Sequence, residues 1–193
     1  QSNWASAGEL PTRPWRGSTA LPRRLSLRGE TLVQQPAVTV SVPPVVDWKD
    51  VAVPDGGIDL PPDAHGSALR IQARIRPEGA GVELHVRGDG ARQSAVRIRH
   101  SDGMLSVDRS DATGIDFAAT LGDAVTAAVV LRDGALDLDI WIDTLSVEVF
   151  ADGGAVTVSE QVLTADDHIG VHLASDRAGA IIESLTVTDL SRR

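Results

Sequence analysis

Strict alternation of apolar and polar residues limits most strongly how this chain can fold. From Leu69 to Arg76 the odd positions are apolar and the even positions are polar, apart from Ala73 being small. A two-residue period places one face of a β-strand on a core and the other face in water. The same alternation recurs in segments 82–87, 95–100, 136–142, 145–149 and 181–190.

Glycine-containing turns separate these segments. They occur at Arg87-Gly88-Asp89-Gly90, Arg132-Asp133-Gly134-Ala135 and Asp152-Gly153-Gly154, where we expect glycines with positive φ. Only Phe117 to Ala124 has room for a turn or two of helix. About ten short strands joined by regular turns predict an all-β fold, either a sandwich or a barrel.

Charge and composition exclude several classes of function. The formal net charge is -9, which argues against binding to nucleic acid or anionic membranes, since both need clustered Lys and Arg. No apolar run approaches the roughly 18 residues that a membrane helix needs. The chain has no cysteine, so its core forms without disulfides. At 193 residues it suits one domain, or one domain with an extension.

The first 35 residues differ from the rest. They hold Trp, Pro and Arg in irregular order, and no alternation runs through them. The chain also begins at Gln1 rather than Met, so we expect that this is not the translational start. We predict two parts, with residues 1–35 as the end of a preceding domain and residues 36–193 as the β domain.

Three segments resemble glycoside hydrolase family 32, the fructan-acting enzymes that include invertases, inulinases and levanases. The first is Ser2-Asn3-Trp4-Ala5-Ser6-Ala7, continued by Pro11-Thr12-Arg13-Pro14-Trp15-Arg16-Gly17 and Leu21-Pro22-Arg23-Arg24-Leu25. The second is Leu105-Ser106-Val107-Asp108-Arg109-Ser110, with Gly114 and Phe117 following. The third runs from Ile140-Trp141-Ile142-Asp143 to Ser146-Val147-Glu148-Val149-Phe150, where Thr144 and Leu145 depart from the family's usual Arg and Ser.

The resemblance implies an architecture and a partner. Family members carry a five-bladed N-terminal β-propeller with the active site, followed by a C-terminal antiparallel β-sandwich of two sheets. Residues 1–35 would then be the last strands of the propeller and the linker, and residues 36–193 the sandwich. The rest of the propeller would be absent from this chain and would be its partner.

The resemblance also implies that no catalytic residue lies in this chain. The family uses a nucleophilic Asp in Asn-Asp-Pro-Asn-Gly, an Asp in Arg-Asp-Pro and an acid/base Glu in Glu-Cys. The only asparagine is Asn3, Arg132-Asp133 is followed by Gly134, and there is no cysteine. Retaining glycosidases need two carboxyl groups about 5–5.5 Å apart, so we expect the chain alone to be inert.

Four residues of the first segment are candidates for a functional role. The resemblance places Trp4 and Asn3 near the fructose pocket, where an indole can form an apolar wall with one N–H donor; the alternative is a structural Trp4 that closes the last blade. Trp15 and Arg16 would fix the linker against the propeller. No cofactor is expected.

Other polar clusters have ordinary explanations. His168 and His172, with Asp166 and Asp167, are four residues apart, but a metal site needs three or four convergent ligands, so we expect satisfied histidines and no metal. Asp133, Asp137 and Asp139 lack the pattern of a calcium loop. Asp137, Asp139 and Asp143 around Trp141 are a candidate sugar-contacting face, although packing of Trp141 is the favoured interpretation.

We therefore expect a non-catalytic C-terminal module of an enzyme that acts on β-D-fructofuranosides such as sucrose, inulin or levan. It would stabilise the propeller, shape substrate access or form oligomer contacts. A carbohydrate-binding module and the same module of a fructotransferase are the alternatives. An extracellular bacterial protein is expected, with a cytoplasmic one as the alternative.

Overall fold

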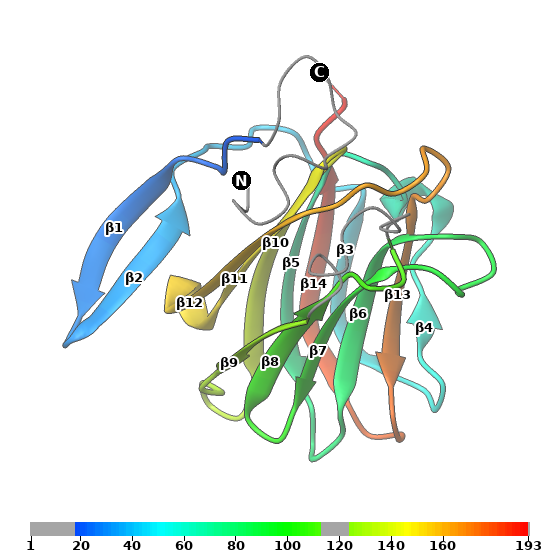
Figure 1. Ribbon diagram of the computed structural model, residues 1–193. Helices are drawn as coiled ribbons and strands as arrows, with labels where there is room; N and C mark the ends of the chain where they lie inside the picture. The colour runs from blue at the N-terminus through cyan, green and yellow to red at the C-terminus, as the bar shows by residue number, and fades with distance from the viewer. Residues whose placement is uncertain (1–17, 113–123, 193) are drawn as a thin grey trace.

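A computed structural model describes residues 18–112 and 124–192 as two six-stranded antiparallel sheets and a separate two-stranded hairpin (Figure 1). The first sheet, here the β5 sheet, has the order β12 (Val156–Gln161), β11 (Ser146–Ala151), β10 (Leu136–Asp143), β5 (Leu69–Arg76), β14 (Ile181–Asp189), β3 (Val46–Ala52). The second, the β6 sheet, has the order β4 (Ile58–Asp59), β13 (Gly170–Ser175), β6 (Val82–Gly88), β7 (Val96–Ser101), β8 (Met104–Asp108), β9 (Val125–Ala128). Helical structure in the described residues is limited to two 3-10 turns, η1 (Pro62–Ala64) and η3 (Asp152–Gly154).

The core lies between the two sheets, as the alternation predicts. On β5, Leu69, Ile71 and Ile75 are no more than 1% exposed, while the even-numbered residues are intermediate or exposed. Leu84 and Val86 on β6 pack against this layer from the other sheet. Closing two such apolar faces on each other removes both from water. The prediction of an all-β, two-sheet antiparallel sandwich is confirmed.

The turn predictions are confirmed at two of the three sites. Asp133 and Gly134 have φ values of 52° and 76°, and Gly153 and Gly154 have 62° and 97°. The expectation is wrong at 87–90, where neither glycine has a positive φ and Arg87 itself does, at 54°. The left-handed backbone turns Arg87 inward, where it is 1% exposed and its Nε donates a hydrogen bond to Thr164 Oγ1 at 2.9 Å.

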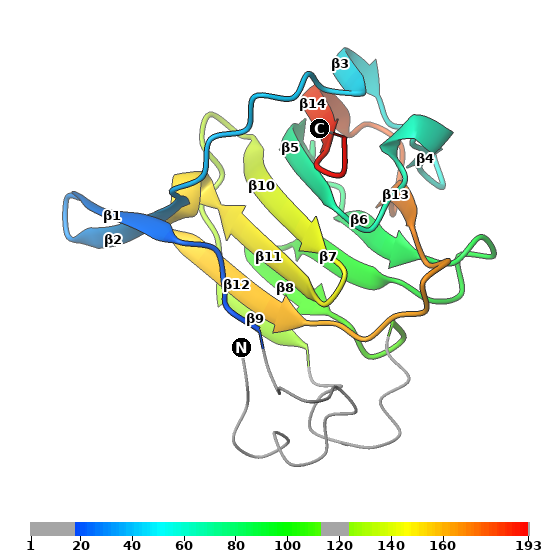
Figure 2. The ribbon, with the colours of Figure 1, turned by 90° about the horizontal axis from the view of Figure 1, so that it is seen from above.

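A hairpin precedes the sandwich and stands apart from both sheets. It consists of β1 (Arg23–Arg28) and β2 (Thr31–Pro36), which pair only with each other. Figure 2 shows it projecting beyond β12, while the chain from β2 crosses over the β5 sheet to reach β3. The hairpin thus flanks one edge of the sandwich without joining either sheet.

Arg109, in the second family-like segment, connects the two sheets through an ion pair and a hydrogen bond. Arg109 follows β8, and its Nη2 lies 2.9 Å from Glu160 Oε2 on β12 of the other sheet. It also donates a hydrogen bond to the carbonyl oxygen of Gln161. Both charged side chains are 11% exposed. Burial raises the pKa of Glu160, against the lowering effect of Arg109.

Stability is expected to fall as the pH drops below about 6.5, because of His100. This histidine on β7 is 5% exposed, and neither ring nitrogen has a hydrogen-bond partner. Burial lowers its pKa from 6.5, with Asp102 acting in the opposite direction. The unfolded chain therefore takes up the proton first, and stability is lost at up to about 1.4 kcal/mol per pH unit.

Urea unfolding of the wild type and of His100→Leu between pH 7 and pH 5 measures this loss. The variant should show a flatter dependence of stability on pH than the wild type. Equal slopes in the wild type and His100→Leu would contradict the prediction.

Candidate functional site

Glu148 anchors the segment before the sandwich to the outer face of the β5 sheet. It lies on β11 and is only 3% exposed, although it belongs to the polar parity of its strand. Its Oε1 accepts a hydrogen bond from the Leu21 amide at 2.7 Å, and its Oε2 accepts from Arg23 Nη2 at 3.1 Å and from Ser159 Oγ at 3.0 Å. A buried carboxylate with this many donors holds the chain firmly in place.

Asp152 provides a second anchor, at the other end of the hairpin. It lies in η3, is 4% exposed, and accepts a hydrogen bond from Arg28 Nη2 at 2.6 Å. Arg132 forms an ion pair with the same carboxylate from the loop before β10. These contacts give the hairpin two points of attachment, since Arg23 begins β1 and Arg28 ends it.

The hairpin also contacts the sandwich through its backbone. A Cβ built on Gly154 would overlap the carbonyl group of Gln34 on β2, so only glycine permits this approach. The side chain of Gln34 accepts from Arg23 Nη1 at 3.0 Å and donates to Thr157 Oγ1 on β12 at 3.3 Å. We call the surface formed by Glu148, Asp152, Gly154 and the hairpin residues that contact them the seam.

Three apolar side chains remain exposed on the hairpin, on the face that also carries Arg23 and Gln34. Leu27 pairs with Leu32 across the two strands, and Leu25 lies two residues away on the same face. Their exposed fractions are 73%, 49% and 62%, respectively. Three large apolar residues on one side of a two-stranded ribbon are characteristic of a surface that packs against a further element. The seam therefore holds an apolar face in a defined position beside the sandwich.

A polar groove of about 700 Å³ separates the hairpin from the outer face of the β5 sheet. Its floor is built from ion pairs, with Arg70 bonded to Asp139 by two contacts of 2.9 Å and Arg74 bonded to Asp137 at 2.7 Å. Trp141 lies beneath Arg70, whose guanidinium carbon is 4.7 Å from the ring centroid. Trp141 is 6% exposed, which supports the packing interpretation over a sugar-stacking face.

The expectation that both histidines are hydrogen-bonded is confirmed for His172 and wrong for Nδ1 of His168. His172 Nδ1 contacts Asp59 Oδ1 at 2.8 Å, whereas His168 Nδ1 is buried without a partner. No group of three or more His, Asp or Glu side chains in residues 18–112 and 124–192 is arranged to hold a metal ion. The described chain also contains no helix long and apolar enough to cross a membrane.

The four residues predicted for the substrate pocket and linker lie outside the described residues. Asn3, Trp4, Trp15 and Arg16 all belong to segment 1–17, so their roles stay predictions. Sequence reasoning missed Glu148 and Asp152 as anchors. Glu148 lies in the third family-like segment, but an acidic residue on the polar face of a strand gives no sign that another segment will bury it.

A family model described as "Glycosyl hydrolases family 32 C terminal" matches residues 40–189. Curated relatives extend the similarity to the start of the chain. A levanase from Bacillus subtilis is 27% identical over 99% of this chain and 30% of its own length. An extracellular exo-inulinase from Aspergillus awamori is 24% identical over 90% of this chain and 34% of its own length. The chain thus spans about a third of the length of these two relatives.

Solved structures share the fold. The crystal structure of exo-inulinase from Aspergillus awamori superposes with a TM-score of 0.85 at 22% identity, covering 96% of this chain and 38% of that one. A β-fructofuranosidase from Schwanniomyces occidentalis superposes with a TM-score of 0.80 at 17% identity, covering 97% and 43%. At such identities the likeness concerns the fold alone.

Proposed function

Because the chain belongs to glycosyl hydrolases family 32, as its C-terminal domain, we propose that it is the non-catalytic sandwich of a retaining enzyme acting on β-D-fructofuranosides. Its role is to hold the catalytic propeller in a fixed orientation. Substrates of the sucrose, inulin or levan type come from the similarity to levanase and exo-inulinase. We also propose that the enzyme acts outside the cell, because the exo-inulinase relative is described as extracellular.

The seam is the observation that carries this proposal. A hairpin that pairs with no other described strand is nevertheless fixed at both ends by the buried carboxylates of Glu148 and Asp152. The start of the family match at residue 40 supports assigning residues 1–35 to the preceding domain. We propose that the hairpin completes that domain, with Leu25, Leu27 and Leu32 packed inside it. The contacts of the seam then fix the orientation of the sandwich relative to the propeller.

The chain alone is expected to release no fructose from sucrose, inulin or levan. The catalytic motifs of the family are missing from its sequence, so hydrolysis requires the carboxylates of the preceding domain. Reducing-sugar assays and chromatography of the products measure release, with the intact mass of the sample recorded. The whole protein serves as the positive control.

Release by the purified chain of the correct mass would refute the proposal. Products of the whole protein distinguish the alternatives, because a fructotransferase yields longer oligosaccharides where a hydrolase yields fructose. A whole protein that acts on no fructoside would refute the substrate class while leaving the structural role of the seam intact.

A further inference from the structure

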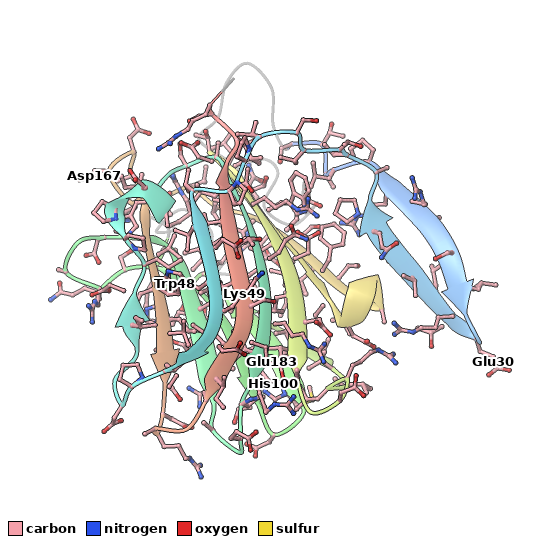
Figure 3. The ribbon with its side chains drawn as sticks, turned by 180° about the vertical axis from the view of Figure 1, so that it is seen from behind. Glu30, Trp48, Lys49, His100, Asp167 and Glu183 are labelled. Atoms are coloured by element: carbon pink, nitrogen blue, oxygen red, sulfur yellow. The ribbon has the colours of Figure 1, made fainter. Side chains whose placement is uncertain are left out.

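A second pocket, of about 440 Å³, lies far from the seam. It is formed at the edge of the β6 sheet by β4, β13, the end of β6 and the loops around them. Figures 1 and 2 show β4 and β13 on the side of the sandwich opposite the hairpin. In Figure 3, Asp167 of this pocket and Glu30 at the hairpin tip lie on opposite sides of the molecule. The pocket therefore lies on the other side of the sandwich from the hairpin.

Hydrogen bonds donated by backbone amides fix the walls of this pocket. The loop after β6 is closed by Asp89, whose Oδ1 accepts from the amides of Gln93 at 2.8 Å and Ser94 at 3.2 Å. The opposite wall is held by Gly66, whose amide donates to the Ile169 carbonyl at 3.0 Å. The register of β13 shifts between Gly170 and His172, an irregularity of the kind that often re-aims side chains beside a site. The pocket is preformed.

Hydrogen-bonding side chains converge on the pocket in fixed orientations. His172 and His85 lie opposite each other on β13 and β6, with ring centroids 5.6 Å apart. Asp59 Oδ1 lies 2.8 Å from His172 Nδ1, and Glu83 Oε1 lies 2.5 Å from His85 Nε2. Arg92 forms an ion pair with Asp59 from the loop after β6. Each imidazole is thus oriented by a carboxylate.

Apolar side chains supply the rest of the lining. Leu60 and Val171 are 2% exposed beneath the pocket, and Ile169 is 38% exposed beside it. A pocket with an apolar surface and a few oriented polar groups suits a small molecule with both kinds of surface. The C–H groups and hydroxyls of a sugar ring provide that combination.

The charges of the lining restrict the ligand further. The lining contains three carboxylates, those of Asp59, Asp89 and Asp167, and one guanidinium, that of Arg92, so an anionic ligand is disfavoured. A bound metal ion is disfavoured by the lack of a suitable ligand group in the described residues. A neutral, hydroxyl-rich ligand remains the best fit to both the charge and the shape.

We infer that this pocket binds one fructosyl unit of a polymeric substrate; this inference rests on the proposed function. A second attachment point holds a long fructan near the enzyme after the end of the polymer leaves the active site. Linking two weak sites on one polymer raises the overall affinity through effective concentration. A short oligosaccharide, which reaches only one site, gains little.

Titration of the isotope-labelled 193-residue chain with a short β-2,1-linked and a short β-2,6-linked fructo-oligosaccharide tests the inference by NMR. We expect saturable amide shifts at Ile169, Val171 and His172, with a dissociation constant on the order of 1 mM for at least one linkage. Asp59→Ala and Ile169→Ser should each weaken binding about tenfold. Val130→Ser removes an apolar side chain that is 63% exposed outside the pocket, and should leave binding unchanged.

Amide spectra of each variant first confirm that the fold is retained. Shifts confined to the groove at Arg70 and Gln72 would overturn the inference, as would no shift at the pocket with either linkage. If the whole protein nevertheless releases fructose, the proposed function stands without this site. A gluco-oligosaccharide is titrated as a control, and its binding without binding of either fructan would overturn the inference and contradict the fructan assignment. Zinc chloride is a second control. Shifts of the pocket amides with zinc, but with neither fructan, would overturn the inference alone.

Discussion

Replacing Arg109 by Met is expected to lower the free energy of unfolding by about 3–5 kcal/mol. Arg109 pairs with Glu160 where both side chains are 11% exposed, and it also donates to the Gln161 carbonyl. Met fills much of the same volume but leaves the Glu160 carboxylate buried without this partner. Because the contact joins the end of β8 to β12, its loss also loosens the two sheets at that end. Urea unfolding at pH 7 measures the change.

The pH dependence and a matched control separate this effect from a general one. Burial already raises the pKa of Glu160, so a lower pH allows the carboxyl group to take up a proton in the folded state. The loss of stability in Arg109→Met should therefore be smaller near pH 5 than at pH 7.

Arg97→Met is the matched control. It breaks an ion pair with Asp111 in which the side chains are 28% and 48% exposed, and it should cost about 1 kcal/mol or less. Equal losses in the two variants would contradict the prediction.

Replacing Gly154 by Ala is expected to detach the hairpin from the sandwich. Gly154 has a φ of 97°, which costs a residue with a Cβ about 1–3 kcal/mol, and the added atom would overlap the carbonyl of Gln34. The backbone of β2 must move away, and the contacts of Arg28 with Asp152 are then strained as well. Hydrogen–deuterium exchange should show faster exchange in 23–36 and little change in β5 and β6.

Gly153→Ala is the matched control for this variant. Gly153 also has a positive φ, 62°, but the nearest atom to its built Cβ lies at 3.6 Å, an ordinary contact. Its cost should be the backbone strain of about 1–2 kcal/mol, with no change in exchange at the hairpin. In the whole protein, Gly154→Ala should also lower the melting temperature of the catalytic domain. If residues 23–36 exchanged equally fast in both variants, the close approach of Gly154 to the Gln34 carbonyl would not be what holds the seam together.

The seam explains why two of the family-like segments contain the residues they do. Arg23 belongs to the first segment and Glu148 to the third, and the structure brings them to 3.1 Å although 125 positions separate them. A carboxylate that accepts from Leu21, Arg23 and Ser159 cannot be exchanged for Gln without leaving donors poorly matched. The two segments are parts of one contact between the hairpin and the sandwich.

Much of the fold follows from local patterns. The alternation in 69–76 corresponds to β5, and that in 136–142 to β10, because a two-residue period leaves only one face to bury. Short strands without an alternating face, such as β4 and β9, have no such signal. The prediction fails differently at Arg87. A charged residue in a glycine-rich turn is expected at the surface, but Arg87 has a left-handed backbone and its side chain is buried.

The class of the fold, the inward-facing residues of the main strands and the family of the chain can all be inferred from the amino-acid sequence. The fold class and the inward-facing residues depend on the order of apolar and polar residues within a few positions of each other, whereas the family depends on short motifs such as Pro14-Trp15-Arg16-Gly17. The buried anchors could not be inferred in this way, because Glu148 and Asp152 look like surface residues until the folded chain places the hairpin over them. The second pocket was likewise undetectable beforehand, because Asp59, His85, Asp89 and His172 come together only when β4, β6 and β13 pair.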